Sequence, residues 1–417
     1  MAPHQQFPTR HREAEPRGTR LGRPLRLVSG LRGPVDEALL DRLGRALLEQ
    51  DEAGAAVAAA MRRAPGDPER VTHAHLRAAL SSGSGESTPP ALRRFLDEVS
   101  TPPDWVDWDR VARGARVFDR LGRSAGDVLL QLSLIGGYRF GGPTELLVAT
   151  GGLKGPHTLR RIAETQQWTL SLMRPGALRP GGEGWRTTLH VRVMHALVNS
   201  AYAGDPERWD VQRWGLPINQ ADQAGTLGLF DATLVVGCRA LGIPVPRDDA
   251  EDLLHLWKYV GWLMGVHPDF LTDDEDERTW LNLHILYAAA GQTQAGRELA
   301  QAIVAAQPER RFAGDGAVAR RLRGRYEQER LLSMLTMFLG PASMRELGLP
   351  IRPPWAFAGA FGANTWRHRV IGRSARGRAT NERRGLAVQQ RLQATYVVED
   401  APHAPRVRSG SDGLTYR

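Results

Sequence analysis

The stretch WRTTLHVRVMHALVNSAY, residues 185–202, contains neither glycine nor proline. Its apolar residues recur at helical spacing, which predicts a helix. Two histidines, His190 and His195, lie inside this helix with Arg192 between them. Whether either histidine is a ligand or an ordinary helix residue decides which class of protein this chain belongs to.

Similar helical patterns extend outward from this stretch and fill the chain from about residue 91 to residue 347. Glycine and proline mark the breaks between them, as expected at helix ends. No series of alternating β-branched strands and no internal repeat is visible. The predicted fold class is therefore all-α, with the most apolar helices, such as 128–135 and 227–242, at its centre.

The composition divides the chain into four consecutive segments. Residues 1–35 lack periodicity and are predicted to form a disordered basic tail. Residues 36–90 hold N-terminal helices and a linker, SSGSGESTPP, at positions 81–90. Residues 91–348 form the dense helical domain. Residues 349–417 form an Arg-rich C-terminal extension with a weak helical pattern near 384–396.

Composition excludes several classes of protein. Of the 417 residues, 41% are apolar and 24% are charged, as in soluble globular proteins. No apolar run reaches the roughly 18 residues of a membrane helix. The N-terminus lacks the apolar core of a secretory signal, so we expect a cytoplasmic protein, or a secreted one if the gene start is miscalled. The single cysteine, Cys238, excludes an intrachain disulfide, a thiolate metal cluster and covalent haem attachment.

The net charge of +9 is concentrated at the two ends of the chain. Residues 1–35 hold seven arginines and two glutamates, and residues 366–417 hold eleven arginines and four acids. This distribution argues against a nucleic-acid-binding protein, whose charge would follow the binding surface. The ends are either solvated tails or contacts for an anionic partner or membrane surface.

A helix over residues 158–173 places polar and aromatic side chains on one stripe. Arg161, Thr165 and Trp168 lie at i, i+4 and i+7. Glu164 borders the stripe and can pair with Arg161. Burying an arginine without a partner is costly, so this stripe is unusual for a plain core helix. It suits an apolar wall that must meet an anion or a polar ligand.

The two histidines of the opening stretch do not share a face. They are separated by five residues, or about 140° of rotation, and cannot form a two-histidine metal clip. His195 has Arg192 as a neighbour and apolar residues on the adjacent turns. A neutral histidine in this setting suits a single axial ligand to haem iron. A core histidine bonded to a backbone carbonyl is the structural alternative.

Glu145 follows two glycines and a proline in RFGGPTELLVATGG and opens an apolar run. A carboxylate at a helix start commonly makes a favourable contact with the helix dipole. In an apolar pocket it would instead suit a buried general acid or base. Both interpretations are open on the sequence pattern alone.

Several stretches taken together resemble the latex clearing protein (rubber oxygenase) family and the wider MpaB-type oxygenases, known as the DUF2236 domain. The resemblance covers roughly residues 95–345 and rests on the order and spacing of these stretches. They are TPPDWVDWDRVARGARVF (101–118), LSLIGGYRF (132–140), RRIAET (160–165), VRVMHA (191–196), WGLPINQAD (214–222) and WKYVGWLMGV (257–266).

The resemblance implies a globin-like helical core around a non-covalent b-type haem. It makes His195, in VRVMHA, the iron ligand, with Arg192 and Trp168 as further cofactor contacts. Arg161 and Thr165 match the distal wall of the family, and Glu145 matches its proposed acid/base. These residues, with Glu164, are the predicted catalytic and cofactor-binding set.

The sequence departs from the family pattern at Glu164, where the rubber oxygenases have lysine. A carboxylate there could bind ferric iron, pair with Arg161 or act as a second acid/base. The function implied is a haem oxygenase that uses O₂ to cleave or oxidise a double bond of an apolar, isoprenoid-like or polyisoprenoid molecule. Another haem oxidase or peroxidase-like enzyme, and a non-enzymatic helical protein that binds lipid or a partner, are the alternatives.

Overall fold

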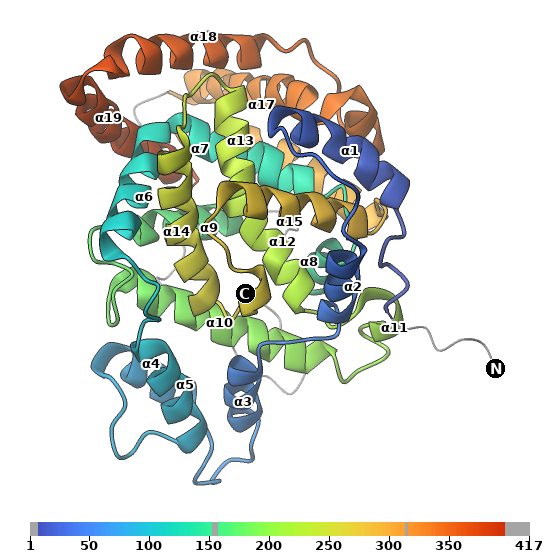
Figure 1. Cartoon of the computed structure of the whole chain (residues 1–417), viewed down its shortest axis with the longest axis vertical. Helices are drawn as coiled ribbons and strands as arrows, with labels where there is room; N and C mark the ends of the chain where they lie inside the picture. The colour runs from blue at the N-terminus through green and yellow to red at the C-terminus, as the bar shows by residue number, and fades with distance from the viewer. Residues whose placement is uncertain (1–6, 152–156, 313–315, 397–417) are drawn as a thin grey trace. The chain divides into compact units, whose positions relative to one another are not determined.

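The computed structural model describes residues 7–151, 157–312 and 316–396, and no strand occurs in these three ranges. The described chain consists of α-helices joined by turns and short 3₁₀ or π segments (Figure 1). The all-α prediction is therefore confirmed. Within these ranges, no helix combines the length and the apolar character needed to cross a membrane.

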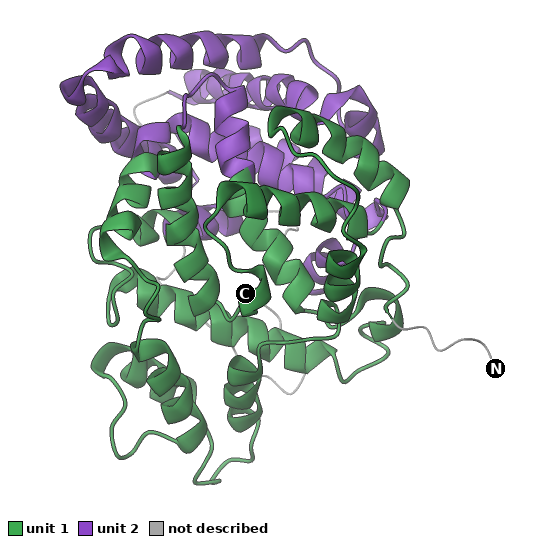
Figure 2. Ribbon diagram, in the orientation of Figure 1, with its two compact units in different colours: residues 1–117, 168–232, 246–290 green, residues 118–167, 233–245, 291–417 purple. Residues whose placement is uncertain are grey.

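The chain forms two compact units, each assembled from three separate segments (Figure 2). Unit 1 contains residues 1–117, 168–232 and 246–290, and unit 2 contains residues 118–167, 233–245 and 291–417. The composition instead predicted four consecutive segments. Shifts in composition reveal linkers along the chain, whereas compact units arise from contacts between residues far apart in sequence.

Unit 1 is a set of packed helices that includes the opening stretch of the sequence analysis. It contains α1 (Glu15–Val28), α2 (Glu37–Ala46), α3 (Glu52–Met61), α4 (His73–Ser82), α5 (Pro90–Ser100), most of α6 (Trp108–Leu121), α10 (Glu183–Tyr202), α11 (Val211–Trp214), α12 (Gln220–Phe230), α14 (Arg247–Leu263), η2 (Pro268–Phe270) and α15 (Glu275–Ala288).

Side-chain caps fix where several of these helices begin. Asp36 accepts a hydrogen bond from Leu39 N, and Asn219 accepts one from Asp222 N. Asp274 accepts from two backbone N–H groups at the start of α15. Such caps satisfy backbone donors that have no partner within the helix and typically stabilise it by about 1 kcal/mol.

The predicted disordered tail is wrong for residues 15–28, which form α1 and pack on α15. The backbone N–H of Arg12 donates to Ala288 O. Gly18 and Gly22 are the buried residues of α1, and a Cβ at Gly18 would overlap the Leu286 carbonyl oxygen. Because the packing face is made of glycine rather than large apolar residues, it leaves no hydrophobic periodicity in the sequence.

Unit 2 is built around a second set of helices and its own apolar core. Its elements are α7 (Arg123–Val128), η1 (Leu129–Ile135), α8 (Pro143–Ala149), most of α9 (His157–Leu172), most of α13 (Ala232–Ala240), α16 (Gln294–Ala306), η3 (Gln307–Glu309), α17 (Ala317–Glu346), α18 (Trp355–Arg369), η4 (Ile371–Arg373) and α19 (Ala375–Ala394).

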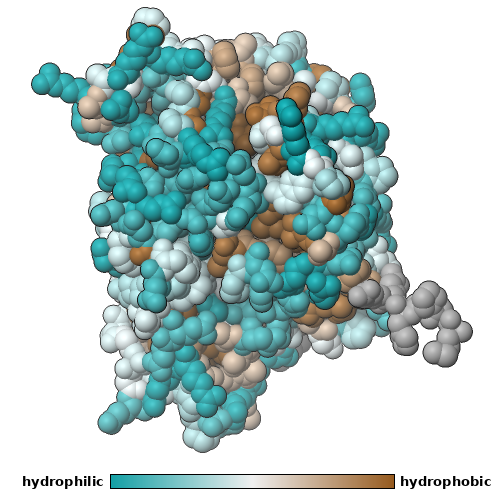
Figure 3. Space-filling model, viewed as in Figure 1, coloured by the Kyte–Doolittle hydropathy of each residue, from teal (hydrophilic) through white to brown (hydrophobic). Residues whose placement is uncertain are grey.

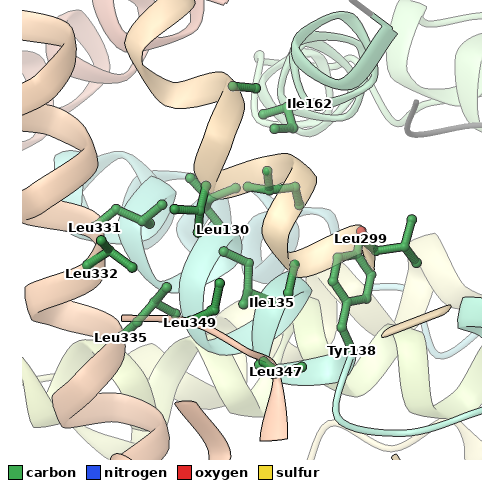
Figure 4. Packing of buried hydrophobic residues seen from close by; sticks show 14 of the residues in the cluster. Leu130, Ile135, Tyr138, Ile162, Leu299, Leu331, Leu332, Leu335, Leu347 and Leu349 are labelled. Atoms are coloured by element: carbon green, nitrogen blue, oxygen red, sulfur yellow. The ribbon is translucent and has the colours of Figure 1, made fainter. Parts of the chain in front are cut away.

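The core of unit 2 gathers leucines and isoleucines from η1, α9, α16 and α17 (Figure 4). Ile135 of η1 and Leu335 of α17 are fully buried there, with Tyr138 at the edge of the same cluster. η1 is a π-helix, a form that is rare and frequent at functional sites. α17 is kinked at Gly340, whose φ of 76° a residue with a side chain rarely adopts.

The Arg-rich extension is more ordered than the sequence analysis predicted. Helices α18 and α19 belong to unit 2, where Asn364 is buried and donates to Ser124 Oγ and Leu241 O. Gln389 donates to the carbonyl oxygen of Phe118. The buried positions of these helices are polar or small residues, so their sequence shows only a weak helical pattern. Residues 397–417 lie outside the described part of the chain.

Candidate functional site

His195 lies on α10, whose two sides differ in burial. Trp185, Leu189 and Val193 are buried, and α10 packs against α3 and α14 of the same unit. His195 is half-buried and adjoins a stripe of half-buried apolar residues at i−4, i−1 and i+3: Val191, Met194 and Val198. The helix thus presents one imidazole within an apolar stripe.

His190 has different surroundings on the same helix. Burial lowers its pKa from the ordinary value of 6.5, and the charges of His73 and Arg77 on α4 lower it further. Among the described residues, no group of three or more His, Cys, Asp or Glu is arranged to hold a metal ion. The structural role of His190 stays a prediction.

Arg192 is buried and bound to another helix start rather than exposed beside His195. Its Nε and Nη2 each lie 2.7 Å from a carboxylate oxygen of Asp51, just before α3. Its guanidinium also lies 5.0 Å from the ring centre of Phe95, and its side chain is 4% exposed. The fork of donors is therefore engaged with Asp51 and ties α10 to the start of α3, and the role of Arg192 as a cofactor contact stays a prediction.

Trp168 is held against α10 by its polar edge. Its indole Nε1 donates to Thr188 Oγ1 at 3.1 Å, and Thr188 Oγ1 donates to Gly184 O. Its ring meets Phe230 and Trp257, with ring centres 5.6 and 6.0 Å away. Trp168 is thus part of an aromatic cluster that fixes the wall of unit 1 next to α10.

The predicted polar stripe of α9 has a different pattern of contacts in unit 2. Glu164 pairs with Arg160 Nε at 2.9 Å, and Arg161 Nη1 lies farther away at 4.0 Å. Thr165 is exposed and donates through Oγ1 to Arg161 O at 3.1 Å. The predicted pairing of Glu164 with Arg161 is thus secondary, because the side chain at i−4 reaches the carboxylate better than the one at i−3.

Glu145 caps the start of α8. Its Oε2 accepts hydrogen bonds from Gly142 N at 2.6 Å and from Thr144 Oγ1 at 2.8 Å. The carboxylate satisfies a backbone donor at the N-terminus of the helix, where negative charge is favourable. This contact is the structural role that the sequence analysis left open beside the catalytic one.

The predicted residues therefore fall into two groups. His195, Arg192 and Trp168 lie in unit 1, and Glu145, Arg161, Glu164 and Thr165 lie in unit 2. Asp51 and Thr188, which bind Arg192 and Trp168, were not among the predicted site residues. Asp51 lies 141 positions from Arg192. Because it directly precedes a helix, it looks in the sequence like an ordinary helix N-cap.

The comparisons with known proteins agree on a family. Residues 125–371 match the model described as the catalytic domain of the "ER-bound oxygenase mpaB/B'/Rubber oxygenase" family, which is more than half of the chain. The matched range includes every predicted site residue. It also extends past residue 348, where the sequence analysis ended its helical domain.

A relative and a solved structure point the same way. The chain is 24% identical over 281 residues to the rubber oxygenase of Streptomyces sp. (strain K30), which covers 66% of each protein. It resembles the structure of latex clearing protein in the closed state with a TM-score of 0.64 and 20% identity, over 82% of this chain and 90% of that one. The structural likeness supports the fold, and the family match carries the assignment: this chain belongs to the MpaB and rubber oxygenase catalytic-domain family.

Proposed function

We propose that the protein is a haem b-dependent oxygenase that uses O₂ to cleave or oxidise a carbon–carbon double bond of an apolar substrate. The observation that carries this proposal is His195, half-buried among apolar residues on α10 and inside the range matched by the family. The imidazole of His195, in this apolar setting, would hold the iron of a non-covalent haem.

The bound haem would supply the chemistry that activates O₂. In a cleavage, both oxygen atoms of O₂ end in the two carbonyl groups of the products, so no external electron donor is needed. Val191, Met194 and Val198 would keep water from the iron ligand and favour an apolar partner. The printed name of the relative suggests a rubber-like, polyisoprenoid substrate for the family, and we propose an isoprenoid-like alkene here.

We propose Glu145 as the group that moves a proton at the allylic carbon of the substrate. Its carboxylate is half-buried and bound to Gly142 N and Thr144 Oγ1. Both partners donate to the carboxylate and fix its orientation. We propose that Arg161 and Thr165 orient oxygen or haem, and that Trp168 supports the haem-side wall.

The first experiment is an absorption spectrum of the full chain reconstituted with haem, before and after dithionite and CO. His195→Ala is expected to lose or shift the Soret band, because it removes the iron ligand. His190→Ala is the matched control, since it alters a half-buried histidine on the same helix and is expected to keep the wild-type spectrum. A chain that binds no haem, or a His195→Ala spectrum identical to wild type, contradicts the proposal.

The second experiment separates the two roles of Glu145. Glutamine can retain the cap but cannot accept a proton, whereas alanine loses both functions. Glu145→Gln is expected to keep the unfolding midpoint and to lower turnover of a polyisoprenoid oligomer by roughly 10²–10⁴-fold, the usual contribution of a general acid or base. Equal turnover in Glu145→Gln and wild type would mean that Glu145 only caps α8 and does not transfer a proton.

The alternative within the same scaffold is a haem oxidase or peroxidase-like enzyme. Glu164 favours it, because this carboxylate stands where the rubber oxygenases have lysine, and in the structure it is exposed and paired with Arg160. Product analysis with ¹⁸O₂ distinguishes the two. An alkene-cleaving oxygenase incorporates label into both carbonyl groups, while an oxidase releases labelled peroxide and leaves the products unlabelled.

A further inference from the structure

Helix α18 of unit 2 exposes large apolar side chains to solvent. Trp355, Phe361 and Trp366 are 45%, 47% and 63% exposed, while Ala356 and Asn364 are its buried residues. A helix on the surface of a globular protein normally turns its apolar stripe inward and its polar stripe outward. α18 departs from this rule, because its most deeply buried side chain is the polar Asn364.

The outward stripe of α18 is continuous along the helix. Trp355, Ala358, Gly359, Gly362 and Trp366 lie at i, i+3, i+4, i+7 and i+11, which is one side of a helix, and all five are exposed. None of them is polar. Small residues between the two tryptophans leave the indole rings as the prominent groups on this side.

The apolar surface continues onto the first turns of α17. Val318, Leu322 and Tyr326 lie at i, i+4 and i+8 and are 74%, 63% and 53% exposed. The ring of Tyr326 meets the ring of Trp355 with centres 5.7 Å apart, which joins the two helices. We name this surface the α17–α18 face. The upper part of Figure 3, where Figure 1 labels α17 and α18 together with α1 and α13, shows brown and tan residues among teal ones.

The segment that contains α18 and α19 is rich in arginine. Residues 352–396 contain nine arginines and one acid, Glu382, which faces Arg120 at 3.6 Å. Arg352 is bonded to Glu329, but the other arginines of this range are exposed: Arg367, Arg369, Arg373, Arg376, Arg378, Arg383, Arg384 and Arg391. Exposed aromatic residues bordered by arginines are typical of segments that lie in the headgroup region of a membrane.

We infer that the α17–α18 face binds the surface of an anionic phospholipid membrane. The indole rings of Trp355 and Trp366 would enter the headgroup boundary, where amphipathic aromatic rings are favoured. The arginines would bind lipid phosphates and gain from the negative surface potential. A second copy of the chain is a poorer occupant, because a symmetric contact would bring the arginines of both copies together. This inference does not depend on haem.

The test is co-sedimentation of the full chain with vesicles of phosphatidylcholine, with and without phosphatidylglycerol. Binding is expected to require phosphatidylglycerol and to weaken as salt is added, because salt screens surface charge. Trp355→Ser with Trp366→Ser, and Arg367→Gln with Arg369→Gln and Arg373→Gln, are each expected to lower vesicle affinity roughly tenfold or more.

Leu48→Ser and Arg94→Gln are the controls, because they change an exposed apolar residue and an exposed arginine in unit 1. Both are expected to bind vesicles like wild type, and circular dichroism checks that every variant is folded. Equal binding to neutral vesicles, or wild-type binding by the face variants, overturns the inference. So does an oligomer that the tryptophan variants dissociate, or equal capture by a neutral squalene emulsion, since either would assign the face to another occupant.

Discussion

Two arginine–carboxylate pairs, one on each of two predicted site helices, differ in burial and therefore in how much they contribute to the stability of the fold. In unit 1, Arg192 binds Asp51 through two 2.7 Å contacts, and these side chains are 4% and 12% exposed. In unit 2, Arg160 meets Glu164 at 2.9 Å, and these side chains are 29% and 43% exposed. Water screens the second pair but not the first. The first pair is therefore a structural tie, while the second can change with little cost to the fold.

The largest expected effect is the loss of Arg192. Arg192→Met would leave Asp51, whose side chain is 12% exposed, without its main partner, and breaking such a pair typically costs about 3–5 kcal/mol of unfolding free energy when it is buried. Chemical denaturation followed by circular dichroism measures this change. Adding Asp51→Leu is expected to recover much of the loss, because replacing both charges with apolar groups is often nearly neutral. An Arg192→Met variant as stable as wild type would contradict the claim that this pair stabilises the fold more than the exposed pair does.

A smaller loss of unfolding free energy is expected at Gly265, where the backbone lies close to Arg192 and Asp51. Gly265 has a φ of 78°, and a Cβ there would lie 2.6 Å from Asp51 Cγ and 2.7 Å from Arg192 Nε. Gly265→Ala is expected to cost about 1–3 kcal/mol through backbone strain and displacement of the pair. Gly66→Ala is the control, since Gly66 has a φ of 92° with no atom near its Cβ position. Equal losses of unfolding free energy in both variants would mean that strain alone matters.

The fold class could be predicted because helix periodicity is a local signal. The helix of the opening stretch, residues 185–202, lies within α10, which starts two residues earlier at Glu183. The predictions failed where packing depends on small or polar residues. Helix α1 packs through Gly18 and Gly22, and α18 is held by Asn364, so neither shows an apolar stripe toward its unit.

The candidate site could be predicted only in part. Spacing separated His190 from His195 and placed Arg161, Glu164 and Thr165 on neighbouring turns of one helix. Spacing alone did not find Asp51, because the partner of Arg192 comes from a helix start 141 positions away. Long-range partners are set by tertiary packing, so a helix pattern predicts that a buried arginine needs a carboxylate but not which one.

Protonation of His190, on the other side of α10, is expected to change the stability of the fold by a still smaller amount. Burial, together with His73 and Arg77, lowers the pKa of His190 from 6.5. As pH falls below about 6.5, the unfolded chain therefore binds the proton first, and this histidine makes the fold less stable. His190→Ala is expected to reduce the fall of the melting temperature measured above and below this pH. An unchanged pH dependence would mean that His190 is equally solvated in both states.

The smallest effect on stability is expected at the exposed pair. Glu164→Gln removes one partner of an i, i+4 contact, which is worth about 0.3–0.5 kcal/mol and is screened by salt. Arg160→Gln is the matched variant, because it breaks the same pair and keeps the carboxylate. If Glu164 takes part in catalysis, Glu164→Gln lowers turnover while Arg160→Gln does not, although both leave the melting temperature nearly unchanged. Equal turnover in both variants would mean that Glu164 is a surface residue of α9 with no part in catalysis. A stability loss as large as that of Arg192→Met would show that the pair is buried in solution.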